Sequence, residues 1–209
     1  MLRVAYLCLI ALFAGCAGST TEVQRIEAVP EVDKTYKRIL VFAVTKKEQI
    51  RVAVESELVS ELNKSEFEAS RFEEPNANIP WEDPGAIQQL VAEEARSGDY
   101  DGVLVVSLIR KNRESRYVPE QVVYQPIVTS IGPLASTTYM DTTVVPPSYQ
   151  ETVNYVLKST LFDTVSTNPV WQLYSKTVNP DSLDAAAKDF GKVVVKALRK
   201  TLPHAAEEK

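Results

Sequence analysis

Apolar residues follow two different periods along the chain, and each period predicts a different kind of element. Residues 39–44 form a continuous apolar run, Ile-Leu-Val-Phe-Ala-Val, which is typical of a strand that is buried on both faces. Residues 102–109 form a second run of this kind. Between the two runs, apolar residues recur every four positions from Ile50 to Leu62, which predicts a helix with one apolar stripe. Buried strands separated by helices indicate an α/β fold.

Shorter signals predict the remaining elements of the first half. Thr45 and Glu48 have the spacing of a capping box at the start of the first helix. Residues 67–72 alternate in polarity, which predicts a short strand at a sheet edge. Asp83 and Pro84 then provide a cap and a first-turn proline for a second helix, which ends near Gly98.

The second half predicts a hairpin followed by a last helix. Residues 151–165 and 170–178 are strand-like and flank the turn signal Ser-Thr-Asn-Pro, and an amphipathic helix begins after Ser182. We therefore expect one α/β domain over residues 37–209, with three helices on a mixed sheet of about five strands. The expected order is β-α-β-α-β-insert-β-β-α, with the insert at about residues 110–150.

The start of the chain predicts a targeting signal. The apolar run from Val4 to Ala14 is eleven residues long, whereas a helix that spans a bilayer needs about 20. Residues 12–16, Leu-Phe-Ala-Gly-Cys, overlap the end of this run and resemble the lipobox of bacterial lipoproteins. This resemblance implies a signal peptide at residues 1–15 and acylation of the Cys16 thiol, with palmitate among the acyl chains. Ordinary secretory cleavage after Ala17 is the alternative.

Residues 16–36 would join the lipid to the domain. The stretch after Cys16 is small, polar and acidic and follows no sustained period, which predicts a flexible tether with a reach of about 25 Å. Ala17 stands where lipoproteins that stay in the inner membrane carry Asp. We therefore expect a lipid-anchored protein of the cell envelope, on the periplasmic face of the outer membrane.

Composition excludes several classes of function. The 209 residues are 44% hydrophobic and carry a formal charge of -5, which argues against binding nucleic acid through a general basic field. The only two Cys lie in the first 16 residues and the only His is His204, so the sequence supports neither a disulfide scaffold nor a Cys/His zinc site. It also contains no glycine-rich phosphate motif. We assign no catalytic residue, metal ligand or cofactor, and we do not expect an enzyme.

The insert is the least ordinary stretch of the chain. Between Tyr117 and Gln150 only Glu120 and Asp141 are charged, and five prolines argue against a long helix or an extended ladder. Three interpretations stay open: a hairpin that folds back over the sheet, an aromatic surface that contacts a partner protein or polymer, or strands that enter the membrane on oligomerisation.

Six residues are candidates for partner contact. They are four tyrosines of the insert and two residues on either side of the later turn: Tyr117, Tyr124, Tyr139, Tyr149, Asp163 and Trp171. Asp163 has an alternative role, because an Asp before a turn often accepts hydrogen bonds from the turn backbone.

Several segments resemble a group of uncharacterised proteobacterial lipoproteins. The resemblance lies in residues 38–44 (RILVFAV), in residues 100–106 (YDGVLVV), and in Leu-Phe-Asp at 161–163 followed by Val170-Trp171. The element order is also similar to that of the α/β domains of the curli-secretion lipoprotein, the lipoprotein activators of penicillin-binding proteins and the amino-terminal domain of TolB. Those proteins bind envelope partners.

The resemblance thus implies a noncatalytic module for partner binding or assembly, with a possible homo-oligomer. The alternatives are an envelope hydrolase or carboxylate metal-dependent enzyme, and a subunit of an oligomeric secretion or envelope complex.

Overall fold

The computed structural model describes residues 20–28, 34–130 and 136–202. Its described residues belong to two compact units. Unit 1 is built from the chain up to Lys111 and from Asn154 onward, and unit 2 comprises Asn112–Val153. Cys16 and His204 lie outside the described residues, so the signal peptide and the lipid on Cys16 stay predictions.

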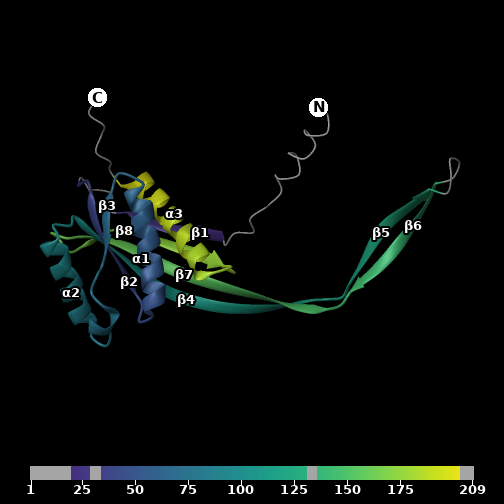
Figure 1. The fold of residues 1–209 in the computed structure, drawn as a ribbon, viewed down its shortest axis with the longest axis horizontal. Coiled ribbons are helices and arrows are strands. Elements are labelled where there is room, and N and C mark those ends of the chain that lie inside the picture. Colours follow the sequence, from purple (N-terminus) through teal and green to yellow (C-terminus); the bar gives the residue numbers. More distant parts are fainter. Residues whose placement is uncertain (1–19, 29–33, 131–135, 203–209) are drawn as a thin grey trace, which may run out of the picture. The chain divides into compact units, whose positions relative to one another are not determined.

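Unit 1 is organised around a mixed six-stranded sheet (Figure 1). Its order is β1 (Thr20–Ala28), β8 (Pro169–Val178), β7 (Ser148–Asp163), β4 (Gly102–Val118), β2 (Arg38–Val44) and β3 (Glu68–Arg71). β2 pairs in parallel with β3 and β4, whereas β8 pairs antiparallel with β1 and β7. Three helices accompany this sheet, so the predicted α/β class is confirmed.

The helices are α1 (Glu48–Asn63), α2 (Pro84–Ser97) and α3 (Leu183–Thr201), with a short 3₁₀ turn η1 (Asn76–Asn78) before α2. The Asp83 side chain caps α2 by accepting from Ala86 N at 3.0 Å, and Ser182 caps α3 in the same way. The capping box predicted for α1 was wrong. Lys47 is the N-cap there and makes no side-chain cap bond, while the Thr45 hydroxyl accepts from Lys47 N.

Two apolar cores lie on opposite faces of the sheet. α1 and α3 cover one face, where Ile39 and Val41 of β2 pack with Leu58 of α1. The alternate residues of β2, Leu40 and Phe42, point to the other face and pack with α2. This division explains why the β2 sequence is apolar without interruption, because both of its faces are covered. No helix among the described residues is long and apolar enough to cross a membrane.

A charged pair is buried beside the first core. Glu55 Oε1 accepts from the Ala43 backbone N at 2.9 Å, beyond the last register pair of β2 with β3. Arg51 donates to the carbonyl oxygens of Phe72 and Glu74 at 3.1 and 2.9 Å. Burial raises the pKa of Glu55 to about 7, although the bond from Ala43 and the charge of Arg51 oppose the shift. Glu55 thus holds the end of β2, and Arg51, one helical turn earlier on α1, holds the segment that follows β3.

Within the predicted tether of residues 16–36, the structure corrects the expectation of flexible chain at residues 20–28. Residues 20–28 form β1, which pairs with β8 from Thr20↔Val178 to Ala28↔Trp171. The polar composition of this segment is explained by its position, since an edge strand has one neighbour and keeps much of its surface in water. The sheet thus gains a sixth strand that the sequence pattern did not indicate.

Unit 2 corrects the expectation that the prolines break an extended ladder. β5 (Gln121–Ser130) and β6 (Ser136–Val145) form a two-stranded antiparallel sheet, and Pro126 is in register with Met140 inside it. Each strand of a two-stranded ribbon is an edge strand, where proline is tolerated. The insert is therefore built from β5, β6 and the adjoining ends of β4 and β7.

Candidate partner-binding surface

Two of the predicted contact tyrosines meet in unit 2. Tyr117 lies near the end of β4, and Tyr149 lies near the start of β7, its neighbour in the sheet. Their ring centroids are 5.3 Å apart with an interplanar angle of 57°. The two side chains remain 54% and 72% exposed despite this contact. The pair is a preformed aromatic patch, and its two rings offer rigid contact area with little entropy to lose on binding.

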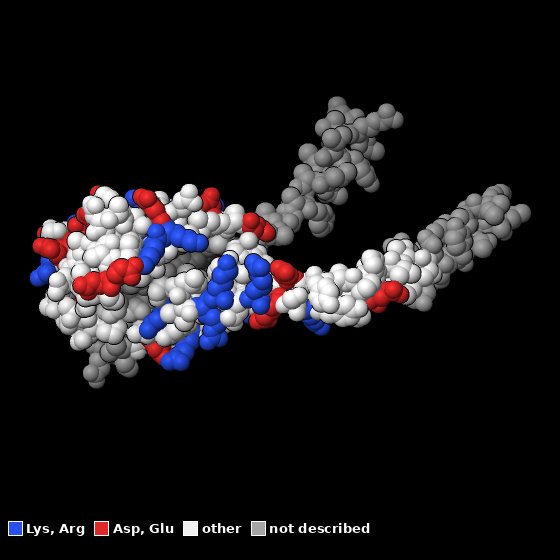
Figure 2. Space-filling view, turned by 90° about the horizontal axis from the view of Figure 1, so that it is seen from below, with Lys and Arg blue, Asp and Glu red and all other residues white. Residues whose placement is uncertain are grey.

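Exposed valines lie on β5 and β6 of the same unit, Val122 and Val144 on one face of the two-stranded sheet and Val123 and Val145 on the other. Val122 is the register partner of Val144, and both are exposed, as are Val123 and Val145. We call the described side chains of Tyr117, Tyr149 and these four valines the apolar ribbon. Between Tyr117 and Tyr149, Glu120 is the only charged residue whose side chain is described, so charged groups are rare along this stretch (Figure 2). Exposed apolar groups gathered in this way commonly mark an interaction site.

Tyr124 and Tyr139 are placed by their strands alone. Tyr124 is in register with Thr142, and Tyr139 is in register with Ile127. Their side chains lie outside the described part of the structure. Contact by these two tyrosines therefore stays a prediction.

Asp163 lies in unit 1, where its carboxylate is occupied by the turn between β7 and β8. Oδ1 accepts from the backbone N of Val165 at 3.0 Å and of Ser166 at 2.6 Å. Oδ2 receives Lys34 Nζ at 2.5 Å and the Tyr36 hydroxyl at 3.2 Å. The turn-bonding role that we gave as the alternative for Asp163 is thus the one in the structure.

The environment of Asp163 keeps it ionised. Burial alone raises the pKa of its carboxyl, but the hydrogen bonds from Lys34 and Ser166 outweigh burial and hold the pKa well below its usual range. Burial and the neighbouring carboxylate raise the pKa of Tyr36 above its usual value. A carboxylate that is only 7% exposed and fully engaged has little left to offer a partner.

The structure also corrects the contact role expected for Trp171. Its side chain is 1% exposed and packs in the first core, and its Nε1 donates to Thr201 Oγ1 at 2.7 Å. The indole therefore ties β8 to the last turn of α3. The sequence pattern placed Trp171 across a turn but gave no sign of which face of β8 the residue would occupy.

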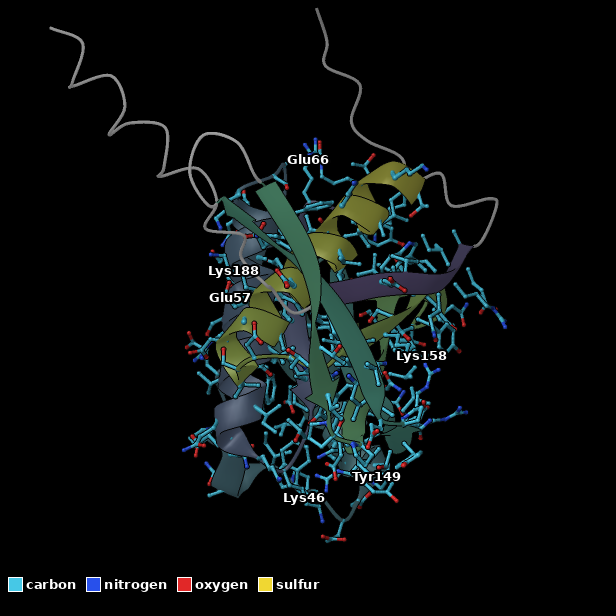
Figure 3. All side chains as sticks on the ribbon, turned by 90° about the vertical axis from the view of Figure 1, so that its right-hand side faces the viewer. Lys46, Glu57, Glu66, Tyr149, Lys158 and Lys188 are labelled. Carbon is cyan, nitrogen blue, oxygen red and sulfur yellow. The ribbon has the colours of Figure 1, made fainter. Side chains whose placement is uncertain are left out.

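Sequence reasoning missed an aromatic residue held between two cations. Arg25 of β1, Tyr174 of β8 and Lys158 of β7 are register partners across three adjacent strands. The Arg25 and Lys158 charges lie 5.6 and 5.4 Å from the Tyr174 ring centroid. Figure 3 shows Lys158 on the side of the sheet away from Glu57 of α1 and Lys188 of α3. This group was missed because residue 25 was assigned to the tether.

Comparison with known proteins gives structural neighbours only. No family model matches the sequence, and no curated protein matches it. Among solved structures, a PelC dodecamer from Paraburkholderia phytofirmans is 15% identical, with 86% of this chain and 97% of that chain covered and a TM-score of 0.47. Lipoprotein GNA1162 from Neisseria meningitidis is 11% identical, with 79% and 99% covered and a TM-score of 0.40.

A putative neuraminyllactose-binding hemagglutinin homolog from Helicobacter pylori is 14% identical, with 81% of this chain and 87% of that chain covered and a TM-score of 0.30.

Proposed function

We propose that this protein is a noncatalytic lipoprotein of the bacterial outer membrane that binds an envelope protein or polymer through the apolar ribbon of unit 2. The observation that carries the proposal is the exposed Tyr117–Tyr149 pair, and the exposed register pair Val122–Val144 of the same unit adds to it. Aromatic side chains in a setting poor in charge are enriched at the centres of protein interfaces.

Binding a partner would also stabilise unit 2. A hairpin of two strands is marginally stable in water when nothing packs on it. Binding at the apolar ribbon would remove the exposed valines and tyrosines from water and stabilise the strands at the same time.

Self-association is a second candidate, and one observation favours it. β5 and β6 form a sheet of only two strands, so each has an open edge whose backbone groups can pair with another strand. A second copy of this chain offers the same edges. The protein would then be a subunit of an oligomeric envelope complex, and the size of a cross-linked product distinguishes the two candidates.

Site-directed photocross-linking in intact cells tests the surface. A benzophenone amino acid replaces Tyr149 in one variant and Lys188, on the exposed face of α3, in a matched control. We expect a cross-linked product from position 149 and little from position 188. A product at twice the mass of the chain indicates self-association, and any other mass indicates a different partner. Equal products from both positions, or none from position 149, contradict the proposal.

Removal of the ribbon provides an independent test. A variant in which a short Gly-Ser turn replaces residues 117–149 should keep the unfolding transition of unit 1 but lose the partner or the oligomer. The two cores of unit 1 contain no residue of that segment, which is why folding should survive. An unfolded deletion variant would instead assign the segment to the folding core.

Fractionation tests the anchor separately. With Cys16→Ser the processed chain should leave the membrane pellet after a high-salt wash, because the acyl chains that hold it are no longer attached. A matched Cys8→Ser variant should stay in the pellet. Retention of the Cys16→Ser chain would contradict the lipid anchor without affecting the conclusion about the apolar ribbon.

A further inference from the structure

An open apolar groove lies in unit 1 on the side of the sheet that carries α2. Its volume is about 930 Å³, and Phe42 of β2 with Val103 and Val105 of β4 lines its floor. One wall is α2, and the other is formed by Phe162 at the end of β7 and Val165 in the turn that follows. Volumes of this size are typical of pockets that hold small organic ligands.

The groove is open because the two faces of the sheet are covered unequally. α1 and α3 both pack in the first core, whereas α2 alone contributes a helix to the second core. Apolar side chains therefore reach solvent along its borders. Val44 is 41% exposed and Val165 is 86% exposed, and both line the groove.

One end of the groove is aromatic. Trp81 stacks on Phe42 with centroids 6.3 Å apart and an interplanar angle of 16°, and Phe42 meets Phe72 edge-on at 5.0 Å. Trp81 Nε1 donates to the Asn76 carbonyl oxygen at 3.0 Å. Its polar edge is thus satisfied, and the ring offers apolar surface to the groove.

The charged groups of the lining leave one cation without an acidic partner. Asp163 is paired with Lys34, and Lys46 is paired with Glu82. Arg96, in the last turn of α2, donates from Nε to the Ala92 carbonyl oxygen and makes no ion pair within the described residues. The unpaired charge at the groove is therefore positive.

We infer that this groove binds a single-chain amphiphile with an anionic head group, such as a fatty acid. The head group lies at Arg96, and the acyl chain runs along the floor toward Trp81. Arg96 and Pro84, near the two ends of α2, are twelve residues apart, or about 18 Å along a helix axis. That length accommodates a long acyl chain. The inference does not depend on the apolar ribbon of unit 2.

Tryptophan fluorescence tests the inference directly. The chain has two tryptophans, Trp81 in the groove and Trp171, which is 1% exposed in the opposite core. The probe is stearate brominated in mid-chain, which quenches only an indole that it touches. We use the full chain with Cys16→Ser, so that no lipid is attached. We expect saturable quenching that persists in a Trp171→Phe variant and disappears in a Trp81→Phe variant.

Two substitutions sharpen the test. Arg96→Gln should weaken binding about tenfold, which corresponds to the loss of one charge-assisted hydrogen bond. The matched Lys192→Gln variant should change binding less than twofold, because Lys192 is an exposed residue of α3, on the opposite face of the sheet. Ala92→Phe should fill the groove and abolish quenching.

Other results overturn the inference. Quenching without saturation, equal quenching of Trp171, or equal binding of a brominated alkylammonium of the same length would each show that the groove does not select an anionic amphiphile. Unchanged binding by Ala92→Phe, in a variant with an unaltered unfolding transition, would place the ligand elsewhere.

Discussion

Unit 1 and unit 2 use the apolar residues of their strands in opposite ways. In β2 of unit 1, Ile39 and Val41 enter one core while Leu40 and Phe42 enter the other. In unit 2, Val122 and Val144 face each other across β5 and β6 and stay exposed. The apolar residues of unit 1 thus contribute to folding, whereas those of unit 2 are available for association. The predictions below test whether this division holds.

The largest effect should come from the first core of unit 1. Leu58 is 0% exposed on α1, so Leu58→Ala should lower the free energy of unfolding by about 3 to 4 kcal/mol. The matched variant is Leu108→Ala, since Leu108 is 53% exposed on β4 and should cost less than about 1 kcal/mol. Urea denaturation monitored by circular dichroism measures both. Similar losses in the free energy of unfolding for the two variants would contradict the assignment of Leu58 to the core and Leu108 to the surface.

The elements of unit 1 were predictable because their signals are local. The periodic stripe from Ile50 to Leu62 predicted α1, and the capping residues Asp83 and Ser182 predicted where the other two helices begin. β1 was not predictable in this way. An edge strand with a polar sequence has no period that separates it from a linker, and its place is fixed by pairing with β8, about 150 residues later in the chain.

The candidate surface was predictable in part for the same reason. The scarcity of charge between Tyr117 and Gln150 marked the insert as unusual, and the rings of Tyr117 and Tyr149 do meet there. The turn-bonding role of Asp163 could be predicted, because an Asp before a turn often accepts from the turn backbone, whereas the burial of Trp171 could not. Whether a residue on a strand faces a core or solvent depends on which elements cover each face, and that is a property of the whole fold.

The second-largest effect is a pH dependence of stability, which we expect from Glu55 of unit 1. Because the pKa of Glu55 is raised to about 7, the folded state holds this proton more tightly than the unfolded state. The resulting stabilisation is complete below pH 4.5 and is lost as the pH rises through 7. Between pH 5 and 8 the native chain should lose roughly 2 to 3 kcal/mol relative to Glu55→Gln.

Urea denaturation of both chains at the two pH values measures this loss. Asp163 titrates below this window, because the hydrogen bonds from Lys34 and Ser166 hold the pKa of its carboxyl below the usual range. The same slope in both chains would show that another group is responsible. Cross-linking at Tyr149 should not follow this pH dependence, since Glu55 belongs to unit 1.

A smaller effect tests the helix layer of unit 1. Ser182 accepts from Ala185 N at 3.1 Å and caps α3, so Ser182→Ala should cost about 1 kcal/mol of stability. Ser182→Asp restores an acceptor at the same position and should recover most of the loss. Thermal unfolding compares the three chains. A Ser182→Asp variant as unstable as Ser182→Ala would show that the cap contributes little.

The smallest effect on folding should occur in unit 2, where the effect on association should be large. Val144→Thr keeps the β-branched shape and the strand propensity while replacing a methyl group by a hydroxyl on an exposed side chain. Because that side chain is in water before and after unfolding, the free energy of unfolding should change by less than about 0.5 kcal/mol.

Association should weaken in the same variant, since a hydroxyl buried against a partner without a hydrogen bond is unfavourable. The yield of the cross-link from position 149 measures this loss. A Val144→Ile variant, which keeps the site apolar, is the control and should retain the cross-link. If Val144→Thr destabilised the fold as strongly as Leu58→Ala, the valines of unit 2 would belong to a core, and the contrast between the two units would fail.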